Sequence, residues 1–355
     1  MSTAAVQPAL RAGVRRPSGP LLLLVLTACL LIAIVLSFGI GPLKVAPGDV
    51  LRIVFARFGL VDAEGLNARD MAVVWNLRIP RALMGALVGA ALALAGAGLQ
   101  GLFGNPLADP GVVGVSQGAA LGAVAAIVLG ATALGDWTVP VAAFVGGIVS
   151  TTLIYLLARP GHGSGTVTLL LVGIAVGAAC SAAIGFFTYR ASATQLQSLV
   201  FWQMGSLGSA DWSDLGAALP VFLIGLAGML MLATPLDMLA LGERQAQHIG
   251  LDVKRTRALL VMFSALLVGA AVAFAGTIGF VGLVVPHIVR LLAGPRHRWL
   301  LPLSALAGAA LIVVADTAAR TLDPPSEIPL GLFSAAIGAP FFLWLVLRQR
   351  VGGAR

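Results

Sequence analysis

Long apolar stretches separated by short polar segments run along almost the whole chain. A helix needs about 20 apolar residues to cross roughly 30 Å of hydrocarbon, and stretches of this length recur here. They lie at 20–40, 80–103, 112–132, 138–158, 167–188, 214–233, 257–276, 279–293, 300–318 and 328–347. The pattern predicts an all-α polytopic membrane protein with about ten transmembrane helices, in a single domain over residues 1–355.

One polar insert, Pro235–Arg257, interrupts this pattern. Its sequence, PLDMLALGERQAQHIGLDVKRTR, holds too many charged and amide side chains to lie in hydrocarbon. We expect the insert to protrude as a short helical element that another protein binds. The alternative is an ordinary amphipathic loop that lies on the membrane surface.

The composition also places the chain in the membrane. Hydrophobic residues make up 59% of it and charged residues only 10%, against about 25% charged in a soluble domain. The first stretch, Leu21–Phe38, follows a tail with Arg11, Arg15 and Arg16 and so resembles a signal peptide. Its length and the lack of a small-residue cleavage site favour a retained first helix, with residues 1–19 as a cytoplasmic tail.

The distribution of charge tests the orientation. Ten spans that start from a cytoplasmic N-terminus place both chain ends in the cytoplasm. The inner segments then carry 14 of the 22 Lys and Arg residues but only 4 of the 14 acidic residues, as the positive-inside rule expects. The net charge of +8 therefore needs no nucleic-acid partner. Cys29 and Cys180 both fall within spans, where packing is the expected role.

The chain contains an internal repeat. Leu87–Gly96 (LVGAALALAG) and Leu267–Gly276 (LVGAAVAFAG) agree at eight of ten positions. In the expected topology the first copy runs from outside to inside and the second from inside to outside. This is the arrangement of an inverted-topology repeat, so spans two to five and seven to ten should form two related halves. Small residues such as Gly85 and Gly89 are expected to let helices approach closely.

Several motifs occur in order along the chain from about residue 40. They are Arg78-Ile-Pro-Arg81, LVGAALALAGAGLQGLFGNPLADPGVVGVSQGAALG (87–122), FWQMGSLGSADW (201–212), LALGERQAQHIGL (239–251), AGTIGFVGLVVPHIVR (275–290) and SEIPLGLFSAAIGAPFFLWLVLR (326–348). In these motifs the chain resembles the permease family of type II ATP-binding-cassette (ABC) importers for haem, iron-siderophores and cobalamin.

The resemblance implies a transport assembly. Two permease chains would form a homodimer in the lipid of the bacterial inner membrane, with two ATP-binding-cassette ATPase subunits that bind ATP and Mg²⁺. A periplasmic substrate-binding protein would deliver the substrate. The chain itself is expected to be non-catalytic, with no cofactor or metal of its own, because its sequence has no Walker A loop, metal triad or nucleophile arrangement.

Arginines at the outer mouth of the second span are candidates for receptor docking. Pro80 is expected to start this helix, with the guanidinium groups of Arg78 and Arg81 facing the headgroup region. Bidentate contact with carboxylates would orient a docking protein. The resemblance implies that Arg78, Arg81 and Arg320 meet glutamates of the substrate-binding protein. The alternative is interfacial anchoring by snorkelling.

Two further segments receive roles at the inner face. Asn105-Pro106 and Asp109-Pro110 should force a non-helical turn. The resemblance implies that Asn105 and Leu107 form one cytoplasmic constriction. It implies a second constriction at the turn 163–168, with Ser164 and Thr166. A plain loop is the alternative.

The resemblance makes the core of the polar insert a pair of coupling helices that enter a groove of the ATPase. Gly242 and Gly250 should bracket the amphipathic stretch. Glu243, Arg244 and Gln247 should be exposed to the partner. The whole candidate set is Leu241, Gly242, Glu243, Arg244, Gln247 and Gly250.

The substrate is harder to predict. All four histidines are expected inside or near the inner face, so they do not offer haem ligation at an outer entrance; they are His162, His248, His287 and His297. Phe187, Tyr189 and Arg190 could stack on a flat macrocycle and pair with its propionates, although such residues also form ordinary interfacial belts. The run that contains Trp202 and Met204 resembles haem and iron-complex permeases. Haem is therefore favoured, with a siderophore or cobalamin as the alternatives.

Transport of another class deserves comparison. An ion-coupled secondary transporter would also have inverted repeats, but it usually needs acidic groups inside the membrane. Asp316 is the strongest candidate, and it is expected near the outer end of the ninth span. A passive channel would leave the polar insert unexplained.

Overall fold

The computed structural model describes residues 17–353 except 63, 110, 112, 113, 159–164 and 325. Its membrane-crossing and connecting helices run in the following order. They are α1 (Gly19–Gly39), α2 (Pro47–Arg57), α3 (Ala68–Ala72), the π-helix η1 (Val73–Arg78), α4 (Ile79–Phe103), α5 (Val115–Val128), the 3₁₀ turn η3 (Gly135–Trp137), α6 (Thr138–Ala158), α7 (Gly165–Arg190), α8 (Ala193–Gln203), α9 (Trp212–Met231), α10 (Ala233–Leu239), α11 (Glu243–His248), α12 (Val253–Ala275), α13 (Val281–Ala293), α14 (His297–Ala319) and α15 (Leu330–Gly353).

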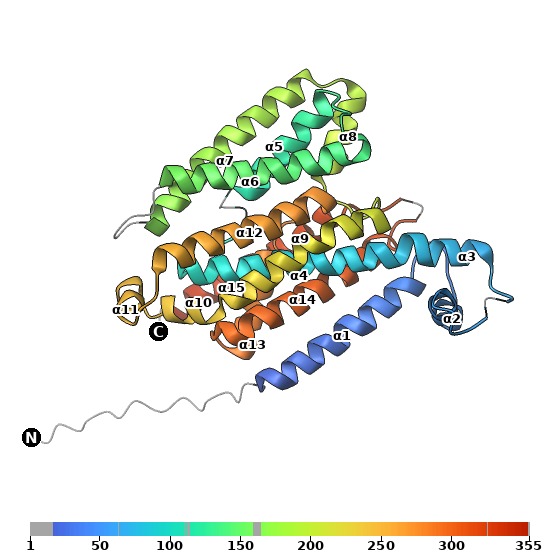
Figure 1. Cartoon of the computed structure of the whole chain (residues 1–355), viewed down its shortest axis with the longest axis horizontal. Coiled ribbons are helices and arrows are strands. Elements are labelled where there is room, and N and C mark those ends of the chain that lie inside the picture. Colours follow the sequence, from blue (N-terminus) through green and yellow to red (C-terminus); the bar gives the residue numbers. More distant parts are fainter. Residues whose placement is uncertain are drawn as a thin grey trace, which may run out of the picture.

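The prediction of about ten apolar helices is confirmed. Seven helical segments of the described chain are long and apolar enough to cross a membrane, and three shorter apolar helices, within α5, α13 and α15, complete the set. In Figure 1, α4, α9, α12 and α14 form the centre, α5 to α7 form a layer on one side, and α1 lies on the other. The polar helices α10 and α11 lie at the opposite end of the molecule from α2 and α3.

The structure corrects the expected start of the second span. Helical structure begins at Ala68, not at Pro80, and passes through η1 into α4 without a break. A proline inside an α-helix removes one main-chain hydrogen bond and collides with the preceding turn. The π-helical turn widens the backbone directly before Pro80 and so accommodates the ring within one long helix.

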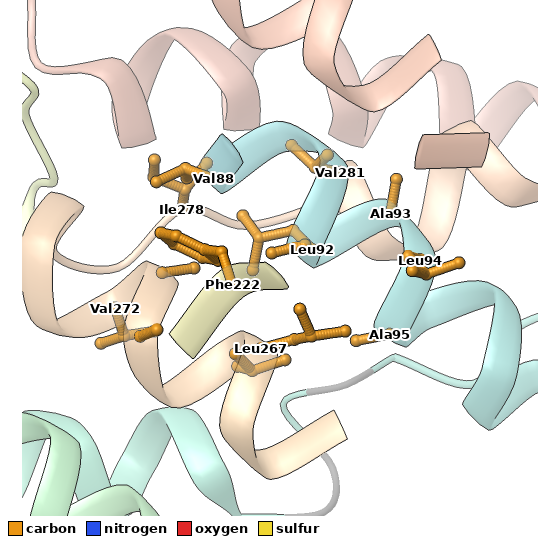
Figure 2. Packing of buried hydrophobic residues seen from close by; sticks show 14 of the residues in the cluster. Val88, Leu92, Ala93, Leu94, Ala95, Phe222, Leu267, Val272, Ile278 and Val281 are labelled. Atoms are coloured by element: carbon orange, nitrogen blue, oxygen red, sulfur yellow. The ribbon is translucent and has the colours of Figure 1, made fainter. Parts of the chain in front are cut away.

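The two copies of the repeat run in opposite directions, as predicted. Near the end of α4, Gly98 lies beside Leu260 at the start of α12. Near the start of α4, Gly85 lies beside Leu207, whose neighbour Ser206 donates to the carbonyl of Ala275 at the end of α12. Figure 2 shows side chains of both copies, Leu92 and Leu267 among them, in one buried cluster with Phe222 of α9.

Each of the two repeat helices also packs on helices of the opposite half. Helix α4 packs on α13 and α14, while α12 packs on α5 and α6. Each half contains a short second helix, α5 or α13, and both short helices begin after a residue in the left-handed conformation. These residues are Gly114 (φ 77°) and Phe280 (φ 66°). Each half is thus completed by helices of the other, as in an inverted repeat.

Helix α8 was not expected from the sequence. It is only 11 residues long and it ends within the protein, so no apolar stretch of membrane length marks it. Its start carries a capping box in which Ser192 and Gln195 bond reciprocally to each other's main-chain N–H. The Ser192-x-x-Gln195 spacing was the signal that could have identified it.

Close approach of α4 and α14 depends on glycine. A Cβ placed on Gly89 would lie 2.2 Å from the main-chain oxygen of Gly308, and one on Gly308 would lie 2.3 Å from that of Gly89. No side chain can move aside to relieve such a contact, because both neighbours are backbone. The two helices would have to separate.

We expect Gly89→Ala to destabilise the protein by about 1–3 kcal/mol, the usual effect of overpacking. Gly216→Ala in α9 is the matched control, because a Cβ at Gly216 meets no atom within 4 Å. It should be neutral or slightly stabilising, since alanine favours helix more than glycine does. Thermal unfolding of both variants in one detergent tests this, and equal melting temperatures would contradict it.

Candidate functional site

Arg78 is a buried residue that ends η1, directly before α4. Its side chain is 4% exposed. The guanidinium donates to the carbonyl oxygens of Phe38 at 2.8 Å and Gly39 at 2.9 Å, and also to that of Leu43. The guanidinium therefore binds free carbonyl groups at the end of α1 and in the loop that follows it. The expectation that this group faces the headgroup region is wrong.

Asp316 of α14 is buried between two arginines. Both Asp316 oxygens accept from Arg81 at 2.8–3.1 Å, a bidentate contact between α14 and α4. Arg320 Nε lies 3.5 Å from Asp316 Oδ2, and Arg320 Nη2 donates to the carbonyl and hydroxyl of Ser37 in α1. The side chains of Asp316 and Arg320 are only 3% and 4% exposed. These groups tie α1, α4 and α14 together.

Glu327 is the second, more exposed partner of Arg81. Its Oε1 accepts from Arg81 Nη1 at 2.9 Å, and its side chain is 38% exposed, against 12% for Arg81. Arg81 is therefore also mostly buried, which corrects its expected position. All three arginines have partners within the chain, and receptor docking stays a prediction for them.

The turn between α4 and α5 has the predicted non-helical form. Helix α4 ends at Gly104 in the left-handed conformation (φ 58°). The Asn105 side chain then accepts from Leu107 N at 2.9 Å, and the Asp109 side chain accepts from Gly111 N at 2.7 Å. Such contacts are typical of turns that end a helix. Burial raises the pKa of the Asp109 carboxyl, although the Gly111 bond opposes this.

The second predicted constriction is only partly described. Ser164 lies outside the described residues, as does His162. Helix α7 begins at Gly165, so Thr166 lies in its first turn, and the expectation of a non-helical turn through Thr168 is wrong there.

The polar insert folds as two short helices, α10 and α11, as predicted. Gly242 (φ 105°) and Gly250 (φ 92°) bracket α11 and adopt a conformation that glycine tolerates best. Leu241, Arg244 and Gln247 are exposed. The Glu243 side chain is 40% exposed and also forms an ion pair with the buried Arg257 of α12, so its contact with a partner stays a prediction. Most of the exposed surface of α11 nevertheless remains free to meet another protein.

A second contact anchors α10. Asp237 Oδ1 accepts from the main-chain N of His297 at 2.8 Å and lies 2.8 Å from its Nδ1. His297 begins α14 and is 4% exposed. Together with the Glu243–Arg257 pair, this contact attaches the polar insert to α12 and α14. A displacement of the insert would therefore also move α12 and α14.

A cavity of about 900 Å³ opens at the other end of the molecule, between α8, α9 and the ends of α6 and α12. Its wall combines aromatic and acidic side chains. These are Trp137, Phe201, Trp202 and Phe274, with Asp136, Asp211, Asp214 and Glu327. Trp137 and Phe274 meet edge to face with ring centroids 6.1 Å apart.

The predicted pathway residues do not form one site. Trp202 lines the large cavity, and Met204 lines a smaller pocket of about 400 Å³ beside it. Phe187 packs edge to face on Phe186. Tyr189 is 85% exposed on α7, and Arg190 next to it is also exposed. The surface of α7 therefore presents these groups outside both cavities.

The fold and these features define a class. The chain is a multi-pass membrane protein with inverted halves, a wide cavity at one end and an exposed helical element at the other. That is the architecture of a transport permease. A model of the FecCD transport family matches residues 29–348, and the chain belongs to this family.

Relatives of this chain include permeases with different substrates in their names. The hemin transport system permease protein HmuU of Yersinia pestis is 47% identical over 285 residues, which cover 78% of this chain and 84% of that protein. The cobalamin import system permease protein BtuC of Halobacterium salinarum is 46% identical over 286 residues, or 81% and 76%. The vitamin B12 import system permease protein BtuC of Salmonella paratyphi A is 42% identical over 330 residues, or 92% and 95%.

Solved structures agree with this assignment. An inward-facing metal-chelate type ABC transporter matches with a TM-score of 0.81 and 33% identity, over 93% of this chain and 99% of that one. PsaBC of Streptococcus pneumoniae, in complex with a Fab, has a TM-score of 0.53 at 20% identity and shares the fold alone. The chain is thus an ABC transporter permease.

Removing the buried carboxylate should be costly. Asp316→Ala leaves Arg81 and Arg320 without their shared partner, and breaking a buried ion pair in this way usually costs about 3–5 kcal/mol. Asp323→Asn is the control, since this side chain is exposed in the segment between α14 and α15. Unfolding of both variants by denaturant in detergent gives the two free energies. A loss below about 1 kcal/mol, as for a surface pair, would contradict this account.

Proposed function

We propose that this permease imports haem across the bacterial inner membrane as a homodimer, driven by two ABC ATPase subunits and supplied by a periplasmic binding protein. Both chain termini would lie in the cytoplasm. The single observation that supports ABC-driven import most is the family match over residues 29–348. A cavity at one end, inverted halves and a protruding helical insert at the other end are consistent with alternating access.

The aromatic wall of the outer cavity supports a flat, largely apolar substrate. Four aromatic side chains offer ring faces and edges for stacking. A volume of about 900 Å³ is within the range of pockets that bind large cofactors. The 47% identity to a hemin permease points the same way.

The acidic side chains of the same cavity favour a second candidate, cobalamin. Four carboxylates line the wall, and they would repel the propionates of haem. The amide groups on the rim of cobalamin carry no such charge and can accept or donate hydrogen bonds. Two BtuC permeases among the relatives are consistent with this alternative. A siderophore remains the third candidate.

Buried charge at the outer end argues against ion-coupled transport. A proton-carrying carboxylate needs access to water during its cycle. Asp316 is instead held by Arg81 and Arg320 and is almost fully buried. ATP hydrolysis on a separate ATPase chain, which would bind ATP and Mg²⁺, supplies the driving force in the proposed assembly.

Transport in proteoliposomes tests the substrate. The permease would be reconstituted with its ATPase and supplied with the binding protein loaded with haem, a ferric siderophore or cobalamin in turn. ATP-dependent uptake of haem alone is expected. Uptake of cobalamin alone would replace haem by the second candidate, and uptake without ATP would contradict ATPase coupling.

Coupling through α11 has its own test. Arg244 is exposed at the start of this helix, so Arg244→Glu should weaken ATPase binding by about tenfold, which corresponds to about 1.4 kcal/mol. Arg298→Glu is the control, because this exposed arginine lies at the same end but in α14. Co-purification of the ATPase with each variant measures the difference. Equal yields would favour an insert that lies only on the membrane.

A further inference from the structure

Three segments meet and form what we call the junction: residues 203–206 at the end of α8, 275–279 between the end of α12 and the start of α13, and 329–331 at the start of α15. They come from far apart in the sequence. Non-helical backbone within a membrane protein is tolerated only where the protein buries it or where it lines a water-filled space. The junction is partly buried, and its remaining residues line two cavities.

Four hydrogen bonds connect the three segments. Three are main-chain bonds, and one comes from a threonine hydroxyl. They are Ser206 N to Ala275 O at 2.9 Å, Leu330 N to Gly205 O at 2.9 Å, Gly331 N to Met204 O at 3.0 Å, and Thr277 Oγ1 to Gln203 O.

Glycines allow the segments to approach this closely. A Cβ on Gly205 would lie 2.7 Å from Thr277 O, and one on Gly276 would lie 2.3 Å from Trp202 O. A Cβ on Gly331 would lie 2.3 Å from Met204 O. In each case the obstacle is backbone and not a mobile side chain. The junction is therefore a tight main-chain contact that a single added carbon would open.

The junction separates two spaces. One set of its residues lines the cavity of about 900 Å³: Ser206, Ala275, Gly276 and Pro329. The neighbouring residues line the pocket of about 400 Å³: Gln203, Met204, Thr277, Gly279 and Gly331. All three segments contribute to both walls, so the junction itself is the partition between the two spaces.

An ion pair holds one segment in place from outside. Glu327 precedes the third segment by two residues and binds Arg81, which is fixed on α4 by its bidentate contact with Asp316. Glu327 Oε2 also lies only 3.3 Å from the position of a Cβ on Gly208, close to the first segment. Arg81 thus joins a rigid helix to the chain that enters the junction.

We propose that the junction is the seal between the outer cavity and the smaller pocket beside it, and that the Arg81–Glu327 pair keeps it closed until a carboxylate of the binding protein replaces Glu327. The proposal rests on the proposed function. A partly exposed ion pair contributes little to stability, so an incoming carboxylate can displace Glu327. Asp316 is buried and stays paired with Arg81 during this exchange.

Thiol labelling tests the seal. In a chain with Cys29→Ser and Cys180→Ala, Met204→Cys reports the pocket side of the junction and Ser206→Cys reports the cavity side. A membrane-impermeant thiol reagent is added to proteoliposomes on the side that the outer cavity faces. Ser206→Cys should react quickly and Met204→Cys slowly. Equal rates would show that the junction is no barrier and would overturn the proposal.

The ion pair is tested in the same chain. Glu327→Gln should raise the labelling rate of Met204→Cys by about five-fold, the largest factor expected for a partly exposed pair. Asp323→Asn removes the same charge from the same segment and should leave the rate unchanged. Gly331→Ala, which opens the main-chain contact directly, should raise it even with Glu327 intact. An unchanged rate in Glu327→Gln would show that the Arg81–Glu327 pair does not keep the junction closed.

The result can be separated from the proposed function. Labelling needs neither ATP nor a substrate, so an error in the choice of haem leaves it unaffected. Conversely, ATP-driven haem import together with equal labelling at both positions would support the proposed function and contradict the proposed seal. Size-exclusion profiles of all variants establish that the folded fractions are comparable.

Discussion

Every main-chain polar group inside a bilayer must find its partner within the protein, and most of this structure follows from that constraint. Long helices satisfy it with their own hydrogen bonds. Where the chain leaves helical form, other groups take over. The guanidinium of Arg78 binds the free carbonyls at the end of α1, and the side chains of Asn105 and Asp109 bind the turn after α4. The junction solves the same problem with main-chain bonds between three segments.

The inverted repeat explains why such interruptions recur. Each half has a long helix, α4 or α12, followed by a break and a short helix, α5 or α13. A short helix leaves room for a non-helical segment at depth within the protein. Because the halves are oppositely oriented, one break lies in the turn after α4 and the other lies at the opposite end of the molecule, beside the large cavity.

The sequence was sufficient for much of the fold, because apolar length and small-residue patterns are local signals. The ten helices, the opposite directions of the repeat and the glycines that bracket α11 were predicted from such signals. Pro80 was misinterpreted because a π-turn has no distinct sequence pattern, and propensity alone favoured a helix start there. Helix α8 was missed because it is too short to span a membrane. The length of a span says nothing about a helix that ends inside the protein.

Charged residues were the least predictable part, and the reason is physical. The sequence shows that a charge exists, but its role depends on which distant residue neutralises it. Glu243 was expected to be exposed to an ATPase, and its additional pairing with the buried Arg257 could not be seen in the sequence. Arg81 was expected at the membrane surface, yet it is mostly buried and paired with Asp316, 235 positions away in the sequence. A buried charge must be paired within the chain, so only partly exposed members of these networks can exchange partners. Among the charges around Arg81, Glu327 meets that condition, and this is why an external carboxylate would act on the junction through it.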